Sequence, residues 1–406
     1  MVLIKRIKGG VCSAKGFRAA GVAAGIKYKD RADVALLVAD APCAAAAVFT
    51  TNKVAAAPVM YDRKVVKAGR IQAIVANSGC ANACTGERGM LDAERTAAAV
   101  AETLGIDPKL VLVASTGVIG HPLPMDRLIS GIGAANKALG KSSEHGLAAA
   151  KAIMTTDTKP KQAAVTTTID GKKVTVAGMC KGSGMIEPNL ATMLGFITTD
   201  AAVSPAMLRR ALALAVAKSF NRLVVDGDES TNDSVFLLAS GEAKNAPITH
   251  GGASFEALRA ALEDVCISLT RQMAADGEGA TKFVTVTVKG AKSEKDAARA
   301  ARAIAKSPLA KTSWFGRDPN WGRVLAAVGY SGSEVSDSLA EVFYDRVWAY
   351  KKGKVADAKQ LAKLAKVLEK PSFEVIVDLH LGSGESSIYT CDFSLDYVHI
   401  NADYTT

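Results

Sequence analysis

The sequence lacks most features of secreted, metal-binding and membrane proteins. Its seven cysteines are an odd number spread over 406 residues, which argues against a disulfide framework. Cys80 and Cys84 have no second cysteine or histidine pair near them, so a zinc site is not expected. No apolar run is long enough to span a membrane, and the N-terminal segment MVLIKRIKGG lacks the continuous apolar stretch of a signal peptide. We therefore expect a cytoplasmic protein with reduced thiols, no bound metal and no membrane contact.

Nucleic-acid partners and the common catalytic motifs also find little support. Aromatic residues make up only 5% of the chain, and the basic residues behind the net charge of +10 are scattered, not interleaved with aromatics. This pattern argues against nucleic-acid binding and fits small anionic substrates. The five histidines are isolated, and neither a G-x-S-x-G nor an H-E-x-x-H motif is present. The run ALGKSS at 138–143 ends like a phosphate-binding loop, but Ala135 stands in place of its first glycine.

Helical and strand patterns alternate along the whole chain. With 49% hydrophobic residues, a chain of this length can form one large domain or two ordinary ones. Ser204-Pro205 is a typical helix start, Gly105 a typical helix end, and Asp170-Gly171 a typical tight turn. The patterns predict helices over 91–104, from 204 onward, and over 254–275, 293–306 and 357–369, a hairpin over 164–177, and strands over 281–289 and 373–381. Because no repeat or linker is visible, we expect mixed α and β layers without a boundary between independent domains.

The run KGSGMIEPNLATMLGFITTDA, from Lys181 to Ala201, places Ala191 directly before the hydroxyl of Thr192. A threonine inside a chain is a poor nucleophile, because its hydroxyl has no base of its own. If the Ala191–Thr192 bond is cut, the new α-amine can act as that base, since its ordinary pKa is about 7.7–8.0. The glycines at 182 and 184, with Pro188, would hold the preceding loop in a strained turn. From the residues alone, a buried threonine after a turn is the simpler interpretation.

Thr116 and Gly117 follow an apolar, strand-like run in VASTGVIG. A turn at the end of a strand can direct backbone N–H groups and a hydroxyl at a developing oxyanion, which is often the largest electrostatic contribution to acyl transfer. From the residues alone, an ordinary strand-to-loop turn is the better explanation.

Two charged residues and the C-terminal segment are further candidates. The ammonium of Lys181 can bind a carboxylate, and Glu278 in ADGEGATK can pair with an amino group just past a predicted helix. Solvated surface positions are the ordinary alternatives for both. The chain ends in HINADYTT, which contains Asn401 and Thr406, and such an end must be tied down if it contributes to a site.

Together these runs resemble the ornithine acetyltransferases, also called glutamate N-acetyltransferases, of the ArgJ family. The resemblance extends from about residue 6 to the C-terminus and includes FTTNKVAAAPV, NSGCANACTG, VDGDESTND and GRDPNWGR. It implies an ArgJ/DmpA-like α/β fold with stacked β-sheets between helical layers. It also implies self-cleavage into fragments 1–191 and 192–406, which would form one catalytic unit and an α2β2 assembly.

The resemblance also implies a role for each candidate. Thr192 would carry the acetyl group, and Thr116 and Gly117 would stabilise the oxyanion. The substrate contacts implied are Thr155, Lys181, Thr192, Glu278, Asn401 and Thr406. Thr155 opens the run TTDT, where Thr156 and Asp157 are close enough to leave its assignment open. The expected substrates are N-acetylornithine and glutamate, with no metal or cofactor, and acetyl-CoA remains open as a second donor.

Two other functions stay compatible with the sequence. A related self-processing amidohydrolase or aminopeptidase would use water in place of glutamate, and a binding protein would leave the Ala191–Thr192 bond intact. The aspartates at 226, 228 and 233 resemble a metal cluster, but an acidic turn that caps a helix is the interpretation we favour.

Overall fold

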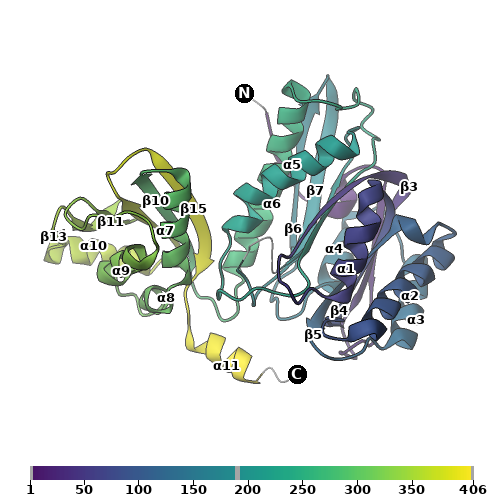
Figure 1. Ribbon diagram of the computed structural model, residues 1–406, viewed down its shortest axis with the longest axis horizontal. Coiled ribbons are helices and arrows are strands. Elements are labelled where there is room, and N and C mark those ends of the chain that lie inside the picture. The colour runs from purple at the N-terminus through teal and green to yellow at the C-terminus, as the bar shows by residue number, and fades with distance from the viewer. Residues whose placement is uncertain (1–2, 188–192, 404–406) are drawn as a thin grey trace.

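The computed structural model describes residues 3–187 and 193–403. Within these residues the chain forms two β-sheets, and Figure 1 shows that they belong to two lobes. The large lobe contains the helices α1 to α6, and the small lobe contains α7 to α10. The mixed α/β class expected from the sequence is therefore confirmed.

The large lobe is built on one nine-stranded sheet among the described residues, in the order β1-β6-β7-β8-β9-β3-β4-β5, with β2 paired to β3. The pairs β4–β5 and β8–β9 are parallel, and the other neighbouring strands are antiparallel. The strands are β1 (Lys5–Ile7), β2 (Phe17–Val22), β3 (Val34–Phe49), β4 (Arg70–Cys80), β5 (Val111–Val118), β6 (Lys161–Ile169), β7 (Lys172–Lys181), β8 (Leu194–Thr199) and β9 (Ser234–Ala239).

This sheet folds back on itself at β3. One end of that 16-residue strand pairs with β4 and the other with β9, and the register with β4 shifts between Val38 and Cys43. A single buried cluster contains Leu37 from one half of the sheet and Phe196 and Phe236 from the other. The two halves therefore face each other across a shared core, which is the stacking that the sequence predicted.

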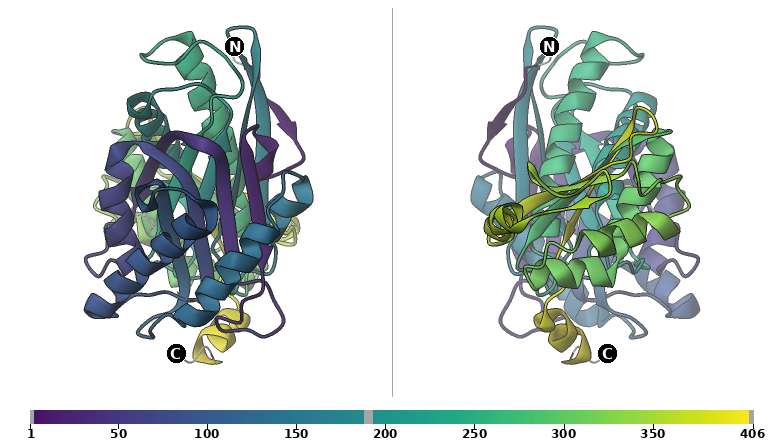
Figure 2. Two further views of the ribbon diagram at one scale, coloured as in Figure 1. Left: turned by 90° about the vertical axis from the view of Figure 1, so that its right-hand side faces the viewer. Right: turned by 90° about the vertical axis from the view of Figure 1, so that its left-hand side faces the viewer.

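Helices cover both outer faces of the folded sheet (Figure 1). Helices α5 (Pro205–Lys218) and α6 (Ala253–Ala275) pack on β6 to β9, while α2 (Gly86–Leu104) and α3 (Met125–Lys137) pack on β3 to β5. In the left view of Figure 2 the second of these helical layers faces the viewer. Helix α1 (Ala57–Val65) lies against β5, and α4 (Ser143–Ala152) against β2 and β3. The expected order of layers, helices outside and sheets between them, is confirmed.

The small lobe has a sheet and a core of its own. Its described strands follow the order β13-β12-β11-β14-β10-β15 around a separate buried cluster that includes Trp314 and Tyr344. The strands are β10 (Phe283–Ala291), β11 (Glu341–Tyr344), β12 (Val347–Lys351), β13 (Lys354–Val355), β14 (Ser372–Asp378) and β15 (Gly384–Cys391). The helices are α7 (Glu294–Lys306), α8 (Pro308–Phe315), α9 (Trp321–Tyr330) and α10 (Ala358–Leu368).

The division into lobes was not expected from the sequence, because no linker marks it. Helix α6 of the large lobe leads to β10 of the small one within a few residues, and α6 also packs against β15. The N–H of Val224 donates to the carbonyl oxygen of Tyr389 over 2.9 Å, which joins the lobes through their backbones. The last helix, α11 (Leu395–Asp403), leaves the small lobe and runs below both (Figure 1).

Local sequence signals located the elements well. Helix α2 ends at Gly105, whose φ of 67° is left-handed, and Ser204 accepts a hydrogen bond from Met207 N at the start of α5. The β6–β7 hairpin turns at Asp170 and Gly171, which both have positive φ. The other predicted helices and strands are present within a few residues of their expected ends. None of the helices in the described ranges combines the length and the apolar character needed to cross a bilayer.

Candidate active site

Thr116 and Gly117 lie at the end of β5, where a bulge at Gly79 interrupts its pairing with β4. Gly117 has a φ of 132°, and a Cβ atom there would lie 2.3 Å from the carbonyl carbon of Gly79. Only glycine satisfies both the dihedral and the available space. Both residues border a pocket, so the predicted oxyanion-binding residues do lie at the end of a strand and face an open space.

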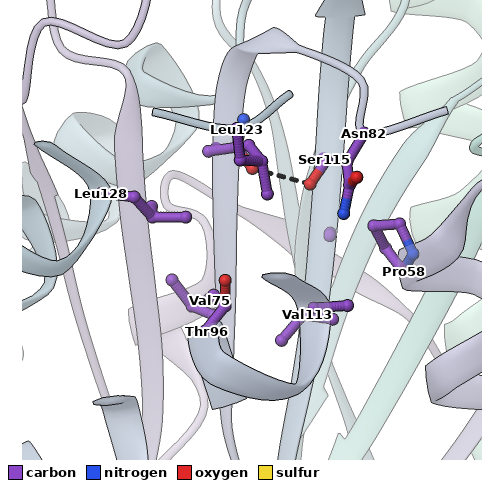
Figure 3. Close-up of a pocket in the computed structure, with 11 residues that line it drawn as sticks. Pro58, Val75, Asn82, Thr96, Val113, Ser115, Leu123 and Leu128 are labelled. Atoms are coloured by element: carbon purple, nitrogen blue, oxygen red, sulfur yellow. Dashed lines mark hydrogen bonds between the residues drawn. The ribbon is translucent and has the colours of Figure 1, made fainter. Parts of the chain in front are cut away.

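Buried polar side chains support the end of β5 from behind. Ser115 Oγ donates to Asn77 Oδ1 over 2.7 Å, and Asn232 Nδ2 donates to the carbonyl oxygen of Ser115 over 2.8 Å. Figure 3 shows Ser115 among the mostly apolar side chains of the neighbouring interior. The segments 77–86 and 225–233, for which the sequence indicated no chemistry, therefore contribute to the position of Thr116.

Thr155 lies in the loop that follows α4. Its N–H donates to Asp157 Oδ2 over 3.0 Å, and its carbonyl oxygen accepts from Arg31 Nη1 over 3.1 Å. Thr155 and Thr156 both line the same pocket as Thr116, so either hydroxyl can face a ligand.

Lys181 is the last residue of β7, and it is only 9% exposed. Its Nζ donates to Thr116 Oγ1 over 3.3 Å. Burial lowers the pKa of this ammonium, and the nearby carboxylates of Asp157, Asp233 and Glu278 oppose that effect. Lys181 is therefore not the solvated surface residue that lysines usually are. It places a poorly hydrated positive charge at the pocket.

Glu278 lies between α6 and β10 and is 8% exposed. One carboxylate oxygen accepts from Asn401 Nδ2 of α11 over 2.9 Å. Gly184 packs against the same carboxylate, because a Cβ atom at Gly184 would lie 2.3 Å from its carbon. The loop after Lys181 and the C-terminal helix therefore both approach Glu278.

The residues before α11 are fixed to the loop that carries Glu278. Asp392 Oδ1 accepts from the N–H groups of Thr281 (2.8 Å) and Lys282 (2.9 Å). Ser394 Oγ donates to the carbonyl oxygen of Gly279 over 2.6 Å. The chain is thus tied down close to the pocket, which the sequence required of a C-terminal segment that contributes to a site.

One pocket of about 140 Å³ unites these groups. Six residues singled out in the sequence line it: Thr116, Gly117, Thr155, Lys181, Glu278 and Asn401. The remaining predicted site residues, Ala191, Thr192 and Thr406, lie outside the described residues. Lys181 pairs with Leu194 across β7 and β8, so the segment that contains the predicted cleavage bond leaves and rejoins the sheet beside the pocket.

Of three buried charged residues behind the pocket, Lys161 and Asp276 were missed from the sequence, and Asp157 was considered only as an alternative to Thr155. Asp157 and Asp276 both accept hydrogen bonds from Lys161. Asp157 and Asp276 had a signal, since each lies two residues from a predicted substrate contact, Thr155 or Glu278. Lys161 had none, because lysine is rarely buried.

The acidic segment around Asp226 does not cap a helix, and that expectation is wrong. Asp226 accepts from the N–H groups of Met185 over 2.5 Å and Ile186 over 2.7 Å, and the element that follows is the strand β9. The carboxylate satisfies a loop that is distant in sequence, which local patterns do not reveal. Among the described residues no group of histidine, cysteine and acidic side chains is arranged to hold a metal ion.

Comparison with known proteins gives a consistent result. A sequence model described as the ArgJ family matches residues 18–406. The chain is 52% identical to the arginine biosynthesis bifunctional protein ArgJ of Geobacter sulfurreducens over 392 residues, which cover 97% of this chain and 99% of the relative. It is also 52% identical to the protein of the same name from Symbiobacterium thermophilum, over 98% of this chain and 99% of the relative.

A solved structure of an ornithine acetyltransferase complexed with ornithine, from Mycobacterium tuberculosis, is 41% identical to the chain. The match covers 46% of this chain and 99% of that one, with a TM-score of 0.43. The family match and the two relatives at 52% identity cover almost every residue. The protein therefore belongs to the ArgJ family.

Proposed function

We propose that this protein is an acetyltransferase of arginine biosynthesis, which moves the acetyl group of N-acetylornithine to glutamate. The observation that carries the proposal is the convergence on one pocket of six residues that the resemblance implies, beside the strands that flank the Ala191–Thr192 bond. Relatives at 52% identity, named as bifunctional proteins of arginine biosynthesis, support the pathway.

The first step is self-cleavage. The Thr192 hydroxyl oxygen attacks the carbonyl carbon of Ala191, and the peptide C–N bond breaks as the nitrogen takes up a proton. Water then hydrolyses the resulting ester, which leaves a carboxylate on Ala191 and a free α-amine on Thr192. That amine lies on the same residue as the nucleophile and supplies its general base.

After this cut, the sheet would hold the two fragments together. Strand β7 of fragment 1–191 pairs with β8 of fragment 192–406, and β3 pairs with β9 in the same way. Each fragment thus completes the central sheet of the other, which supports one catalytic unit. The α2β2 assembly belongs to the same proposal, and the mass of the complex in solution tests it.

Acetyl transfer follows a ping-pong course. The Thr192 oxygen attacks the acetyl carbonyl of N-acetylornithine, the oxyanion is held at Thr116 and Gly117, and ornithine leaves with the proton relayed by the α-amine. The amine of glutamate then attacks the acetyl-threonine ester. N-acetylglutamate leaves, and the hydroxyl is restored.

The charges of the pocket fit an amino-acid substrate. Lys181 supplies a positive charge for a carboxylate, and Glu278 supplies a negative charge for the side-chain ammonium of ornithine. Thr155, Asn401 and Thr406 would complete the contacts. Opposite charges at two sides of a small pocket select for the length of the molecule as well as for its charge.

A second donor extends the proposal. Acetyl-CoA would acetylate the same threonine, which fits the description of the relatives as bifunctional. No resident metal or cofactor takes part, and the reaction would take place in the cytoplasm. Glutamate acetylation with acetyl-CoA as the only donor tests this second activity, and acetylation under these conditions in a Thr192→Ala control would contradict it.

The decisive experiment compares Thr192→Ala with Thr192→Ser. The alanine variant should remain one chain by mass spectrometry and transfer no acetyl group, whereas the serine variant should still be cut and keep part of the activity. The assay follows the release of ornithine and the formation of N-acetylglutamate, and it is repeated without glutamate, where release of ornithine and acetate measures hydrolysis by water. A cut, active alanine variant would refute the mechanism, and hydrolysis that is independent of glutamate would indicate an amidohydrolase.

A further inference from the structure

A triad of charged side chains, Asp157, Lys161 and Asp276, lies directly behind the pocket lining. Lys161 Nζ donates to Asp157 Oδ1 and to Asp276 Oδ2, each over 2.6 Å, and the lysine side chain is 1% exposed. Lys161 opens β6, Asp157 lies in the loop before it, and Asp276 follows α6. Two distant parts of the large lobe, the segment 157–161 and the end of α6, therefore meet at one buried cation.

Asp157 also joins two walls of the pocket. Its Oδ2 accepts from the N–H of Thr155 over 3.0 Å, and its Oδ1 accepts from the N–H of Gly182 over 2.7 Å. Gly182 directly follows Lys181. The spacing between the predicted contacts Thr155 and Lys181 is therefore set by one carboxylate that contacts the backbone beside both.

Asp276 connects these two segments to the segment that carries Glu278. Its carboxylate accepts from the hydroxyl and, over 3.1 Å, from the N–H of Thr158. Its carbonyl oxygen accepts from Ser183 Oγ over 2.6 Å, and the carbonyl oxygen of Ser183 accepts from the N–H of Glu278 over 2.9 Å. The segments that carry Thr155, Lys181 and Glu278 are thus linked through a continuous set of hydrogen bonds.

An ordinary structural salt bridge is the simplest alternative interpretation. Buried ion pairs contribute little net stability compared with apolar residues of similar size, because removing the charges from water costs about as much as their attraction returns. Here Asp157 also accepts from the backbone N–H groups of Thr155 and Gly182, and Asp276 accepts from the N–H and hydroxyl of Thr158. Such a satisfied network fixes relative positions, which an apolar cluster would not do.

We propose that the Asp157–Lys161–Asp276 triad is a positioning unit, which sets the separations among Thr155, Lys181 and Glu278 and thereby controls substrate affinity more than the chemical step. This inference rests on the proposed function, since it concerns the residues that would hold the amino-acid substrate. None of the three is a catalytic residue.

Asp157 has a second effect on Lys181, which is electrostatic. The charged groups that act on the Lys181 ammonium include Asp157, Lys161, Asp233 and Glu278. Burial lowers the pKa of Lys181, and Asp157 provides the largest opposing contribution. Loss of the negative charge at Asp157 therefore lowers the pKa of Lys181 further, so its ammonium is lost at a lower pH.

The test uses the cleaved full-length enzyme and two single substitutions, Asp157→Asn and Asp276→Asn. Asparagine keeps the size and one acceptor oxygen but loses the charge and the second acceptor. The matched control is Asp264→Asn, because Asp264 of α6 pairs with the exposed Arg6 of β1. Steady-state transfer is measured over a range of pH, and calorimetry measures the binding of ornithine alone.

Both triad variants should raise KM for N-acetylornithine by about tenfold, as expected for roughly one lost charge-assisted hydrogen bond, and leave kcat within about threefold. Ornithine binding should weaken in parallel. The alkaline limb of kcat/KM should move to lower pH in Asp157→Asn and move less in Asp276→Asn, because the Asp157 carboxylate accepts from Gly182 next to Lys181, whereas the Asp276 carboxylate accepts from Thr158. The control should behave like the wild type.

Three results would overturn the inference. The first is a wild-type KM and an unmoved pH profile in both triad variants. The second is a loss of kcat alone. The third is a failure of both variants to fold, because a triad that serves only folding is not a positioning unit. A wild-type enzyme that transfers no acetyl group would instead refute the proposed function, and ornithine binding would still report on the triad.

Discussion

The loop that begins at Gly182 is held at both ends by carboxylates, but in opposite surroundings. At its start, Gly182 donates to the buried Asp157. At its other described end, Glu187 pairs with Lys306 of α7, whose side chain is 44% exposed. Solvent screens the ammonium of Lys306 more than the buried pair of Lys161 and Asp157. Glu187 also pairs with Arg302, and its N–H donates to the carbonyl oxygen of Asp228, so the ion pair with Lys306 should contribute least to this end of the loop.

The largest effect on stability should follow from removing the charge of Lys161, which pairs with Asp157 at the buried end of the loop. Lys161→Met leaves two buried carboxylates without their shared partner, which should lower the free energy of unfolding by about 3–5 kcal/mol. Urea denaturation of the uncut Thr192→Ala background measures this change without interference from cleavage. If the free energy of unfolding falls by less than about 1 kcal/mol, solvent screens the charges at both ends of the loop to the same degree, and the difference between the two ends is refuted.

Asp226, which holds the middle of the loop, should have the next largest effect. Asp226→Ala leaves the N–H groups of Met185 and Ile186 without their acceptor, at a cost of about 1–3 kcal/mol for the partly buried N–H of Ile186 and less for the exposed N–H of Met185. The turn before the Ala191–Thr192 bond should then lose its shape, and cleavage should slow. Mass spectrometry over time follows the uncut fraction, and cleavage at the wild-type rate would contradict the prediction.

Gly184 allows a test inside the pocket. In Gly184→Ala the new methyl group would overlap the Glu278 carboxylate, so this carboxylate must rotate away. It can do so because it is the end of a flexible side chain. We expect KM for N-acetylornithine to rise by about tenfold, equivalent to roughly 1.4 kcal/mol, with little change in stability. Thermal unfolding serves as the control for stability. An unchanged KM would show that Glu278 does not take part in substrate binding.

The smallest effect belongs to the exposed end of the loop. Lys306→Met should cost about 0–1 kcal/mol, because the pair it removes is partly hydrated. The effect should shrink further at high salt. Urea denaturation at low and high ionic strength gives both values. A cost comparable to that of Lys161→Met would mean that exposure does not distinguish the two ends.

Much of the large lobe could be predicted because its signals are local. Asp170-Gly171 defines a hairpin, and Ser204-Pro205 defines a helix start, from a few neighbouring residues. The fold of the sheet at β3 depends instead on a change of partner. One end of β3 pairs with β4, and the other pairs with β9, which is distant from β3 in the sequence. No local pattern encodes that pairing, and the small lobe was hidden because no linker precedes it.

The candidate site divides in the same way. Residues embedded in recognisable runs, such as Thr116 in STGVIG and Glu278 in ADGEGATK, could be singled out and were found at one pocket. Lys161 could not be singled out, because it lies in an ordinary strand, and Asp226 was noted in an acidic turn but given the wrong role. Their importance comes from three-dimensional contacts with backbone groups, which have no sequence signature.

Because β8 lies in the middle of the sheet, we expect the proposed cleavage to follow folding. The neighbours β7 and β9 already bond to β8 on both sides, and β7 would lie on the other fragment after the cut. Separated fragments would each expose unpaired strand edges, which favour aggregation. An uncleaved chain diluted from urea should therefore recover its fold, whereas the two cleaved fragments should precipitate. Cleavage would thus make the unfolding of the protein irreversible.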